Sequence, residues 1–328
     1  MGADGAVSVT SFFLIWSTAP ETFPPRAMRA VESVCVRHAS AQVDVLSNTL
    51  PVSFFALQRA AGCDISVERY DLDALVRGTA AEVWYVFRRF WNRSIFYPNH
   101  EADLLRLLRL NGRGGVYVDT DVVFLRPLTL GPCAGAIGIE HGEGGRPAAH
   151  IVAMAGPSQQ SEWAVAADAV MCNAVMAFPR AAPLIARAVD TFAREYLPLT
   201  PGLSMLELHA RGEWGAMGPL LLTRLARRSL AEDDNDSVCV LERAAFYAIS
   251  PPQMATYFGA WDAPRDAPLW DRLHARSIAV HYWNALTARV PVTCGGLMHR
   301  LLDAGCLRAA DGSCVSELPC APAEVRGR

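Results

Sequence analysis

The sequence predicts a single α/β domain built around a mostly parallel β-sheet, and three observations favour it. Segments rich in β-forming residues alternate with segments whose apolar residues recur at helical spacing. The segments at 7–16, 26–39 and 41–48 make a strand–helix–strand unit, which implies parallel strands joined by a right-handed crossover. No internal repeat or low-complexity linker divides the 328 residues, and their 52% hydrophobic content suffices for one large core.

The remaining elements continue this alternation. Residues 131–160 are rich in glycine, proline and small residues without periodicity, so we expect a long loop there. The helix expected at 99–115 ends at glycines, which are typical of helix C-termini. The other expected elements are a helix at 51–62, a short strand and turn at 64–75, strands at 116–125, 172–179, 238–242 and 277–283, helices at 180–197 and 214–230, and a solvated acidic loop at 231–237.

Residues 79–97, TAAEVWYVFRRFWNRSIFY, combine aromatic residues with arginines. This pattern fits an amphipathic helix that touches lipid or a glycolipid acceptor. The favoured interpretation is a helix whose aromatic residues enter the core while its arginines are solvated.

The charged residues exclude several chemistries. All 30 basic residues are arginine, which we attribute mainly to nucleotide bias. Without lysine there is no phosphate-loop lysine, no kinase strand lysine and no Schiff base. A net charge of −3 gives no reason to expect a nucleic acid partner.

The cysteines leave the redox compartment open. There are nine, and none form a C-x-x-C pair, which argues against zinc-ribbon or thioredoxin-like sites. Four crowd the last 35 residues and suit disulfides in an oxidising lumen, although reduced cysteines fit almost as well: Cys294, Cys306, Cys314 and Cys320. Two N-x-S sequons, at Asn92 and Asn235, are compatible with secretion. The apolar run VSVTSFFLIW is too short to span a bilayer, so a lumenal enzyme would need an anchor outside this chain.

The Asp-x-Asp pair at Asp119 and Asp121 is the main candidate for chemistry. Two further pairs, at 71–73 and 234–236, lie in polar segments that are typical of solvated surface. Alternate residues of an extended strand point to one side, so Asp119 and Asp121 could face together at the carboxyl edge of the sheet. Two carboxylates there suit Mn²⁺ or Mg²⁺ that also binds phosphate oxygens. The alternative is a solvated strand end.

The segment ADLLRLLRLNGRGGVYVDTDVVFLRPL, 102–128, resembles the central signature of DXD-containing glycosyltransferases of the GT-A fold. Further motifs follow in the same order: NAVMAF, FAREY, WGAMGPLLLTR, AFYAI and VHYWN. Together they resemble the α-1,4-glycosyltransferase family of lactosylceramide α-1,4-galactosyltransferase and α-1,4-N-acetylglucosaminyltransferase, over most of residues 10–306. Three segments depart from that pattern: the turn at 112–114, the long loop before Asn173 and the segment SPPQM. The identity of the acceptor therefore stays undetermined.

The resemblance implies a retaining, metal-dependent enzyme with a GT-A, Rossmann-like sheet. It would transfer a hexose or N-acetylhexosamine from a UDP-sugar to a glycan or glycolipid, with Mn²⁺ or Mg²⁺ and an α-1,4 linkage. Asp119, Asp121 and His281 would hold the metal, unless His281 is only a hydrogen-bonded core histidine. Our hypothesis is a front-face reaction in which the metal and Arg106 help position or stabilise the leaving diphosphate. No nucleophile is identified, because Glu207 and Asp168 fit the surface better.

The resemblance also implies a donor-binding set. Asp103 and Arg106 would lie behind the pocket, unless they form a surface i, i+3 ion pair. Trp84 is a weaker candidate for the base, and Gly218-Pro219 would shape a turn at the acceptor cleft. The donor-binding set is Trp16, Ser17, Thr18, Asp103, Gly115, Tyr117 and Asn173.

The expected organisation is one domain over 1–328. Residues 7–130 form its nucleotide-sugar half, 131–290 its acceptor half and 291–328 a cysteine-containing tail. Golgi lumen is the expected location, with membrane association only through a missing anchor or the acceptor lipid, and the cytoplasm stays open. Three alternative functions stay open: a GDP-mannose-using α-mannosyltransferase, a non-catalytic nucleotide-sugar-binding or scaffold protein and, less favoured, a phosphohydrolase.

Overall fold

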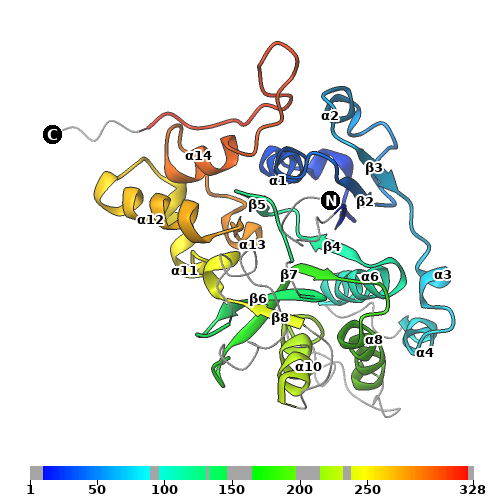
Figure 1. Cartoon of the computed structure of the whole chain (residues 1–328). Coiled ribbons are helices and arrows are strands. Elements are labelled where there is room, and N and C mark those ends of the chain that lie inside the picture. Colours follow the sequence, from blue (N-terminus) through cyan, green and yellow to red (C-terminus); the bar gives the residue numbers. More distant parts are fainter. Residues whose placement is uncertain are drawn as a thin grey trace, which may run out of the picture.

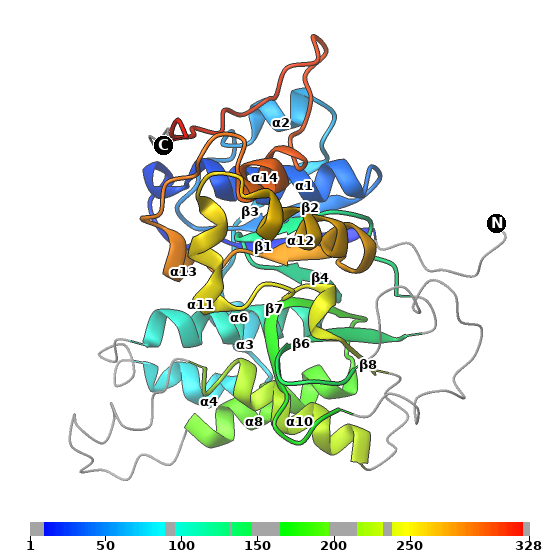
Figure 2. The ribbon, with the colours of Figure 1, turned by 90° about the vertical axis from the view of Figure 1, so that its left-hand side faces the viewer.

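A seven-stranded sheet with helices on both faces is the centre of the computed structural model (Figures 1 and 2). The structure describes residues 10–88, 96–130, 133–145, 165–196, 215–231 and 238–323. In sheet order, the strands are β3 (Ile65–Glu68), β2 (Gln42–Leu46), β1 (Ser11–Ile15), β4 (Gly115–Val118), β7 (Val170–Phe178), β6 (Gly135–His141) and β8 (Val238–Leu241).

Strand direction confirms the prediction of a mostly parallel sheet. β3, β2, β1 and β4 pair in parallel, and β6 pairs in parallel with β8. Only β7, among the strands of this described sheet, runs opposite to its neighbours. The carboxyl ends of β4 and β6 therefore lie at the same edge, with β7 between them.

Helices cover both faces of the sheet (Figure 2). One face packs against α1 (Pro25–Arg37), α2 (Ala56–Ala60), α11 (Pro251–Met254), α12 (Ala263–Arg276), α13 (Asn284–Thr287) and α14 (Leu297–Asp303). The other packs against α3 (Leu72–Val76), α4 (Ala81–Val86), α6 (Tyr97–Arg113), α8 (Pro183–Tyr196) and α10 (Pro219–Ala231). Short 3₁₀ turns lie at Pro20–Thr22, Arg243–Ala245 and Ala255–Phe258.

The apolar run of β1 is explained by these two cores. Phe12 and Leu14 enter the core beneath α1, whereas Phe13 enters the core beneath α6. Successive strand residues point to opposite faces, so a strand covered on both sides is apolar throughout. This is why the segment reads as a continuous hydrophobic stretch rather than an alternating one.

The strand expected at 116–125 is wrong as a single strand. It divides into β4 and β5 (Val122–Phe124), joined by a turn at residues 119–121. The Asp119 N–H bonds to the Ala174 carbonyl at 2.8 Å, and the Val122 N–H turns back to the Asp119 carbonyl at 3.2 Å. β5 then pairs antiparallel with β9 (Ala279–His281) in a separate small sheet.

The loop expected at 131–160 is wrong for its first part, because residues 135–141 form β6 inside the main sheet. Its glycines are explained by close packing. A Cβ on Gly135 would lie 2.4 Å from the Phe178 ring, and one on Gly138 would lie 2.7 Å from the Phe246 ring. Small residues were therefore needed beside aromatic neighbours, and their low β-propensity concealed the strand. Residues 146–160 lie outside the described residues.

The aromatic segment at 79–97 is divided in the structure. Trp84 is fully buried among α4, α6 and α8, which agrees with the core interpretation for that side chain. Val83, Val86 and Phe87 are exposed, so the lipid-contact interpretation stays a prediction. Residues 89–95 lie outside the described residues. Among the residues that are described, no helix combines the length and the apolar character needed to cross a bilayer.

The C-terminal tail is part of the fold through a buried polar cluster on α1. Arg29 and Glu32 form an ion pair at 2.7 Å, and both are almost inaccessible to solvent. Arg29 donates to the carbonyl of Ser316, and the Ser316 hydroxyl donates to Glu32. The Leu307 N–H also reaches Glu32, so each buried charge on α1 has a partner from the tail.

Eight of the nine cysteines form disulfides, and the cysteine left over is the buried Cys172. The bonds join Cys35 to Cys63, Cys133 to Cys239, Cys294 to Cys320 and Cys306 to Cys314. The Cys133–Cys239 bond ties the approach to β6 to β8 across 106 residues.

We therefore expect alkylation in denaturant without reductant to modify one cysteine, Cys172, because the others are oxidised. Mass spectrometry of the labelled peptides measures this directly. The control is the same sample after reduction, in which all nine should react. Labelling of any further cysteine without reductant contradicts the pairing.

His38 joins α1 to the segment after β5. Its Nδ1 donates to the Val34 carbonyl, and its Nε2 accepts from the Leu128 N–H at 2.8 Å. The ring packs against Phe12 and Phe124. Both nitrogens are used in the neutral tautomer, and burial lowers the pKa of His38.

Stability should therefore fall in acid. Because the folded-state pKa lies below the ordinary 6.5, the unfolded chain binds the proton more tightly, and stability is lost as pH falls below about 6.5. The melting temperature of the wild type should drop more between pH 7.5 and pH 5 than that of His38→Gln. His274→Gln, at an exposed position on α12, is the control and should match the wild type. Equal acid sensitivity in wild type and His38→Gln contradicts this assignment.

Candidate active site

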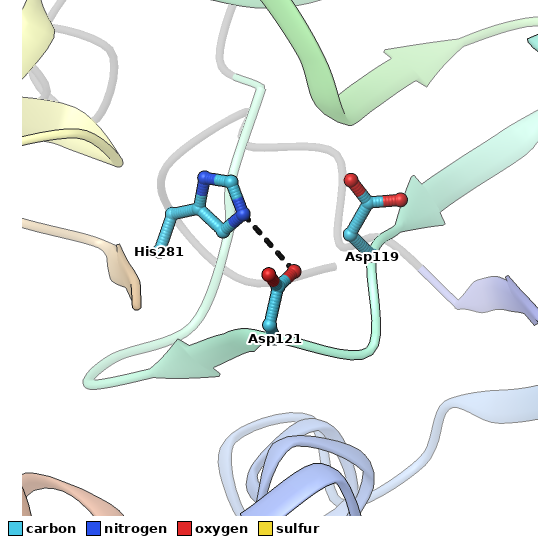
Figure 3. Close-up of side chains that lie close together, drawn as sticks. All are labelled: Asp119, Asp121 and His281. Carbon is cyan, nitrogen blue, oxygen red and sulfur yellow. Dashed lines mark ion pairs between the residues drawn. The ribbon is translucent and has the colours of Figure 1, made fainter. Parts of the chain in front are cut away.

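The turn at 119–121 and the small sheet bring three candidate metal ligands together. Val122 of β5 pairs with His281 of β9, which places His281 beside Asp121 although 160 residues separate them. Figure 3 shows His281 and both aspartates converging on one space. The expected reason for their proximity, alternation along one strand, is wrong: the turn between two sheets positions the carboxylates.

The backbone holds Asp121 tightly. The Tyr282 N–H donates to the Asp121 carbonyl at 2.9 Å, and the Asn284 N–H donates to Asp121 Oδ2 at 2.7 Å. Asp121 Oδ1 lies 3.0 Å from His281 Nε2. One carboxylate oxygen is thus fixed by backbone while the other faces the histidine.

These residues fit a divalent metal ion. One ligand atom from each of Asp119, Asp121 and His281 lies within 4.8 Å of the others. Two carboxylate oxygens and an imidazole nitrogen are a donor set that Mn²⁺ accepts. Inside the described structure the buried Nδ1 of His281 has no partner, which leaves Nε2 as the nitrogen directed to the shared space.

Arg106 lies behind Asp119 in a buried network. Its guanidinium lies 3.5 Å from Asp119 Oδ1 and 3.5 Å from Asp103 Oδ1, and donates to the Asn173 carbonyl at 3.0 Å. Asn173 donates to Asp103 at 2.7 Å, and the Tyr117 hydroxyl donates to Asp119. The guanidinium also stacks over the Tyr117 ring. Asp103 and Arg106 therefore form a buried pair, and the surface ion pair is excluded.

Burial and neighbouring charges perturb the ionisable groups of this site. Burial raises the pKa of Asp119, and the Asp121 carboxylate raises it further against the opposing effect of Arg106. Burial would also raise the pKa of Asp121, but His281 and the Asn284 N–H bring it below its ordinary value. Burial by itself lowers the pKa of His281, and the two aspartates reverse this and raise it. Negative charge is thus concentrated where a cation would relieve it.

A cavity of about 480 Å³ opens beside the three ligands. Its described lining contains four carboxyl groups and one guanidinium, an excess of negative charge that favours a bound cation. The rest of the lining is apolar apart from Cys172, Asn99, Asn173 and His281. The lining includes Asp103, Arg106, Asp119, Asp121, Glu140, Cys172, Asn173, Pro219, His281, Trp283 and Leu286.

Several predicted donor-binding residues meet at or next to this cavity. Asp103 and Asn173 line it, while Tyr117 is buried behind it and holds Asp119. Gly218 belongs to the predicted turn. A Cβ there would lie 2.4 Å from the Asn173 amide nitrogen, so only glycine lets this turn approach the Asp103–Asn173 pair.

Trp16 lines a second cavity of about 540 Å³, between the end of β1 and the C-terminal tail. Its buried indole nitrogen has no partner among the described residues. Asn284 lines the same cavity, and the next residue, Ala285, lines the cavity of the metal ligands. Ser17 and Thr18 line neither cavity.

Other predicted residues lie elsewhere. Gly115 begins β4 at the end opposite Asp119, where its backbone packs against Ser11. Trp84 as a base-contacting residue is wrong, because it is buried in the core under α6. Asp168 is exposed and lines neither cavity, and Glu207 lies outside the described residues.

The sequence did not single out Glu140, Cys172 or Trp283 as cavity-lining residues. Trp283 adopts a left-handed conformation, φ 54°, which is uncommon for a bulky residue and typical of functional sites. Its ring contacts His281 at a centroid distance of 4.0 Å. Trp283 belongs to the VHYWN motif at 280–284, and this motif could have identified it as a cavity-lining residue. No local pattern identified Glu140 in its glycine-rich segment.

Two family models match the chain. The glycosyltransferase sugar-binding region containing the DXD motif matches residues 24–140. The alpha 1,4-glycosyltransferase conserved region matches residues 204–312. The first range includes both aspartates of the site, and the second includes His281, so each contributes part of the cluster.

Curated relatives match at moderate identity. An uncharacterized protein of Arabidopsis thaliana is 26% identical over 309 residues, which cover 91% of this chain and 42% of that protein. Lactosylceramide 4-alpha-galactosyltransferase of Homo sapiens is 27% identical over 271 residues, which cover 78% of this chain and 64% of that enzyme. The chain thus spans less than two thirds of either protein.

Solved glycosyltransferases align with the structure at lower similarity. PaToxG glycosyltransferase has a TM-score of 0.46 at 14% identity, covering 72% of this chain and 74% of its own. The galactosyltransferase LgtC, solved with donor and acceptor sugar analogues, has a TM-score of 0.39 at 13% identity. The alignment covers 90% of this chain and 95% of LgtC.

The sheet order, the DXD turn and the two matched regions lead to one assignment. The chain combines a DXD sugar-binding region of glycosyltransferases at residues 24–140 with an alpha 1,4-glycosyltransferase conserved region at residues 204–312, on a mostly parallel sheet with helices on both faces.

Proposed function

We propose that the chain transfers a hexose or N-acetylhexosamine from a UDP-sugar to a glycan or glycolipid, with retention and an α-1,4 linkage. The observation that most supports metal dependence is the convergence of Asp119, Asp121 and His281 beside an acidic cavity. The similarity to lactosylceramide 4-alpha-galactosyltransferase supports the linkage and a galactose-type donor.

The two cavities support a donor that lies across Asn284. The base would lie beside Trp16, whose indole nitrogen lacks a partner in the described structure. The diphosphate would pass Asp121, and the sugar would enter the cavity lined by Asn173. In this arrangement, only backbone atoms or packing would contribute to donor binding at Ser17, Thr18 and Gly115.

Asp119, Asp121 and His281 would hold Mn²⁺ or Mg²⁺. The bound ion would supply Lewis-acid neutralisation of the charge that develops on the departing diphosphate. Arg106 is bonded to Asp119 and Asn173 behind this site, so we propose that it positions Asp119 rather than contacts the diphosphate. The apolar walls at Trp283 and Leu286 would exclude water from the sugar.

The four disulfides support an oxidising compartment such as the Golgi lumen. Val83 and Val86 on α4 and Phe87 just after it are exposed, which is compatible with a lipid-linked acceptor. An α-mannosyltransferase that uses GDP-mannose is the second candidate, because nothing on Trp16 or its neighbours selects uracil over guanine. A non-catalytic nucleotide-sugar-binding protein is less favoured, since both aspartates and His281 are in place.

A panel of nucleotide sugars tests the donor. We expect Mn²⁺-dependent hydrolysis of UDP-galactose or UDP-N-acetylglucosamine, and little of GDP-mannose, measured by release of the nucleotide. Turnover of GDP-mannose alone contradicts the UDP assignment. Metal-dependent nucleotide binding without turnover, on any donor or acceptor, supports the non-catalytic alternative.

Replacement of Asp121 tests the metal site. Asp121→Asn keeps the shape of the side chain but removes its charge, so we expect Mn²⁺-dependent turnover to fall about 100-fold or more. Calorimetry should show weaker binding of Mn²⁺ with UDP. Asp73→Asn, in an exposed Asp-x-Asp pair on α3, is the matched control and should behave as wild type. Full metal-dependent turnover in Asp121→Asn would contradict the assignment of Asp121 as a metal ligand.

A further inference from the structure

Two polar groups that line the cavity, and a third that packs against His281, are used by neither the metal ligands nor Arg106. Glu140 comes from β6, Cys172 comes from β7, and Tyr247 follows β8 and packs against His281. Cys172 and Tyr247 are buried, and Glu140 is half-buried. Burial raises the pKa of both Cys172 and Tyr247, and Glu140 adds to each shift, so the thiol and the phenol are neutral. Glu140 is the carboxyl group of this wall.

A β-bulge directs Glu140 out of the ladder. Ile139 pairs with Met171 and His141 pairs with Val170, so Glu140 is the extra residue on β6. A second irregularity lies on β7, where Cys172 pairs with Gly138 and Met176 pairs with Ile137. Bulges at such places re-aim side chains and are common beside active sites. Here they present Glu140, Cys172 and Asn173 to one cavity.

Glu140 lies across the cavity from the metal ligands. β4, which leads to Asp119, and β6, which bears Glu140, are separated by β7. At roughly 4.8 Å per strand, their backbones are about 10 Å apart. A sugar whose diphosphate is held at Asp121 would occupy the space between the two sides.

In the part of the chain that the structure describes, Glu140 has a neutral hydrogen-bond partner, the Cys172 thiol, but no cationic one. Within the described residues no arginine pairs with it, and the cavity already has an excess of carboxyl groups. A half-buried carboxylate without a cation costs stability, and this cost is typical of a group that acts on a ligand.

We propose that Glu140 is the carboxylate that faces the donor sugar and stabilises positive charge at its anomeric carbon. The inference rests on the proposed glycosyl transfer. The bond from the anomeric carbon to the diphosphate breaks, and its electron pair leaves on the diphosphate. The acceptor oxygen bonds to that carbon and gives its proton to the departing diphosphate. Glu140 forms no covalent bond in this step, and its charge offsets the cationic character of the sugar.

Glu140→Gln tests this role, with Glu143→Gln as the matched control. Glu143 is an exposed carboxylate three residues away and does not line this cavity. For Glu140→Gln we expect kcat to fall about 100-fold or more. The donor KM should change little, the affinity for Mn²⁺ with UDP should be unchanged, and the melting temperature should be equal or higher. Glu140→Asp keeps the charge and should retain more turnover than Glu140→Gln, whereas Glu143→Gln should match wild type throughout.

The outcomes separate the two proposals. Unchanged kcat in Glu140→Gln, with an active wild type, overturns the role of Glu140 and leaves the transferase assignment intact. A loss of affinity for Mn²⁺ with UDP as large as the loss of kcat also overturns it, because Glu140 would then bind the metal or the diphosphate. A wild type that turns over no nucleotide sugar contradicts both proposals.

Discussion

The buried guanidinium of Arg106 is the interaction on which the site depends. Asp103 is withdrawn from water and the Asp119 side chain is only 27% exposed, so two such carboxylates without a cation would be costly. Arg106 lies within 3.5 Å of each and also bonds to the Asn173 carbonyl. Its neighbour Tyr117 gives Asp119 a hydroxyl donor and gives the guanidinium an aromatic face. Asp119 is therefore held in place before any ligand arrives.

The second constraint is the crossing between the two sheets. β4 belongs to the main sheet and β5 to the small sheet, so the chain must turn at residues 119–121. The turn directs Asp121 to β9, where His281 and the Asn284 N–H fix its two oxygens. The small sheet thus couples the DXD motif to a segment far along the chain, and Trp283 takes a left-handed conformation immediately after it.

The C-terminal part of the chain completes the cavity that contains Trp16. The Cys294–Cys320 disulfide fixes the tail next to Val292, where the Ala321 N–H bonds to the Val292 carbonyl at 2.7 Å. Both segments line the cavity that contains Trp16. The Arg29–Glu32 pair anchors the same tail to α1 at Ser316. The expected tail at 291–328 is thus a wall of the proposed donor site, together with the end of β1.

Local patterns were sufficient for the parallel half of the fold. The strands at 11–15 and 42–46 and the helices α1 and α6 are long, strongly patterned segments, and their periodicity predicts them directly. β6 was missed because glycines fit beside aromatic rings that no local pattern reveals. The break at Asp119 was missed because the apolar residues on both sides of the two aspartates suit a strand, and no local pattern indicates which of two sheets each half will join.

The sequence by itself determined the chemistry of the site, and the tertiary structure decided its geometry. Asp119, Asp121 and Arg106 lie within one short segment, so motif and family resemblance identified them together. His281 was named as a candidate, but its partnership with Asp121 depends on the pairing of β5 with β9. Glu140 depends on a bulge and on the position of β7 between β4 and β6. Residue type and spacing are local properties of a chain, whereas the distance between remote side chains is fixed only when strands pair and cores pack.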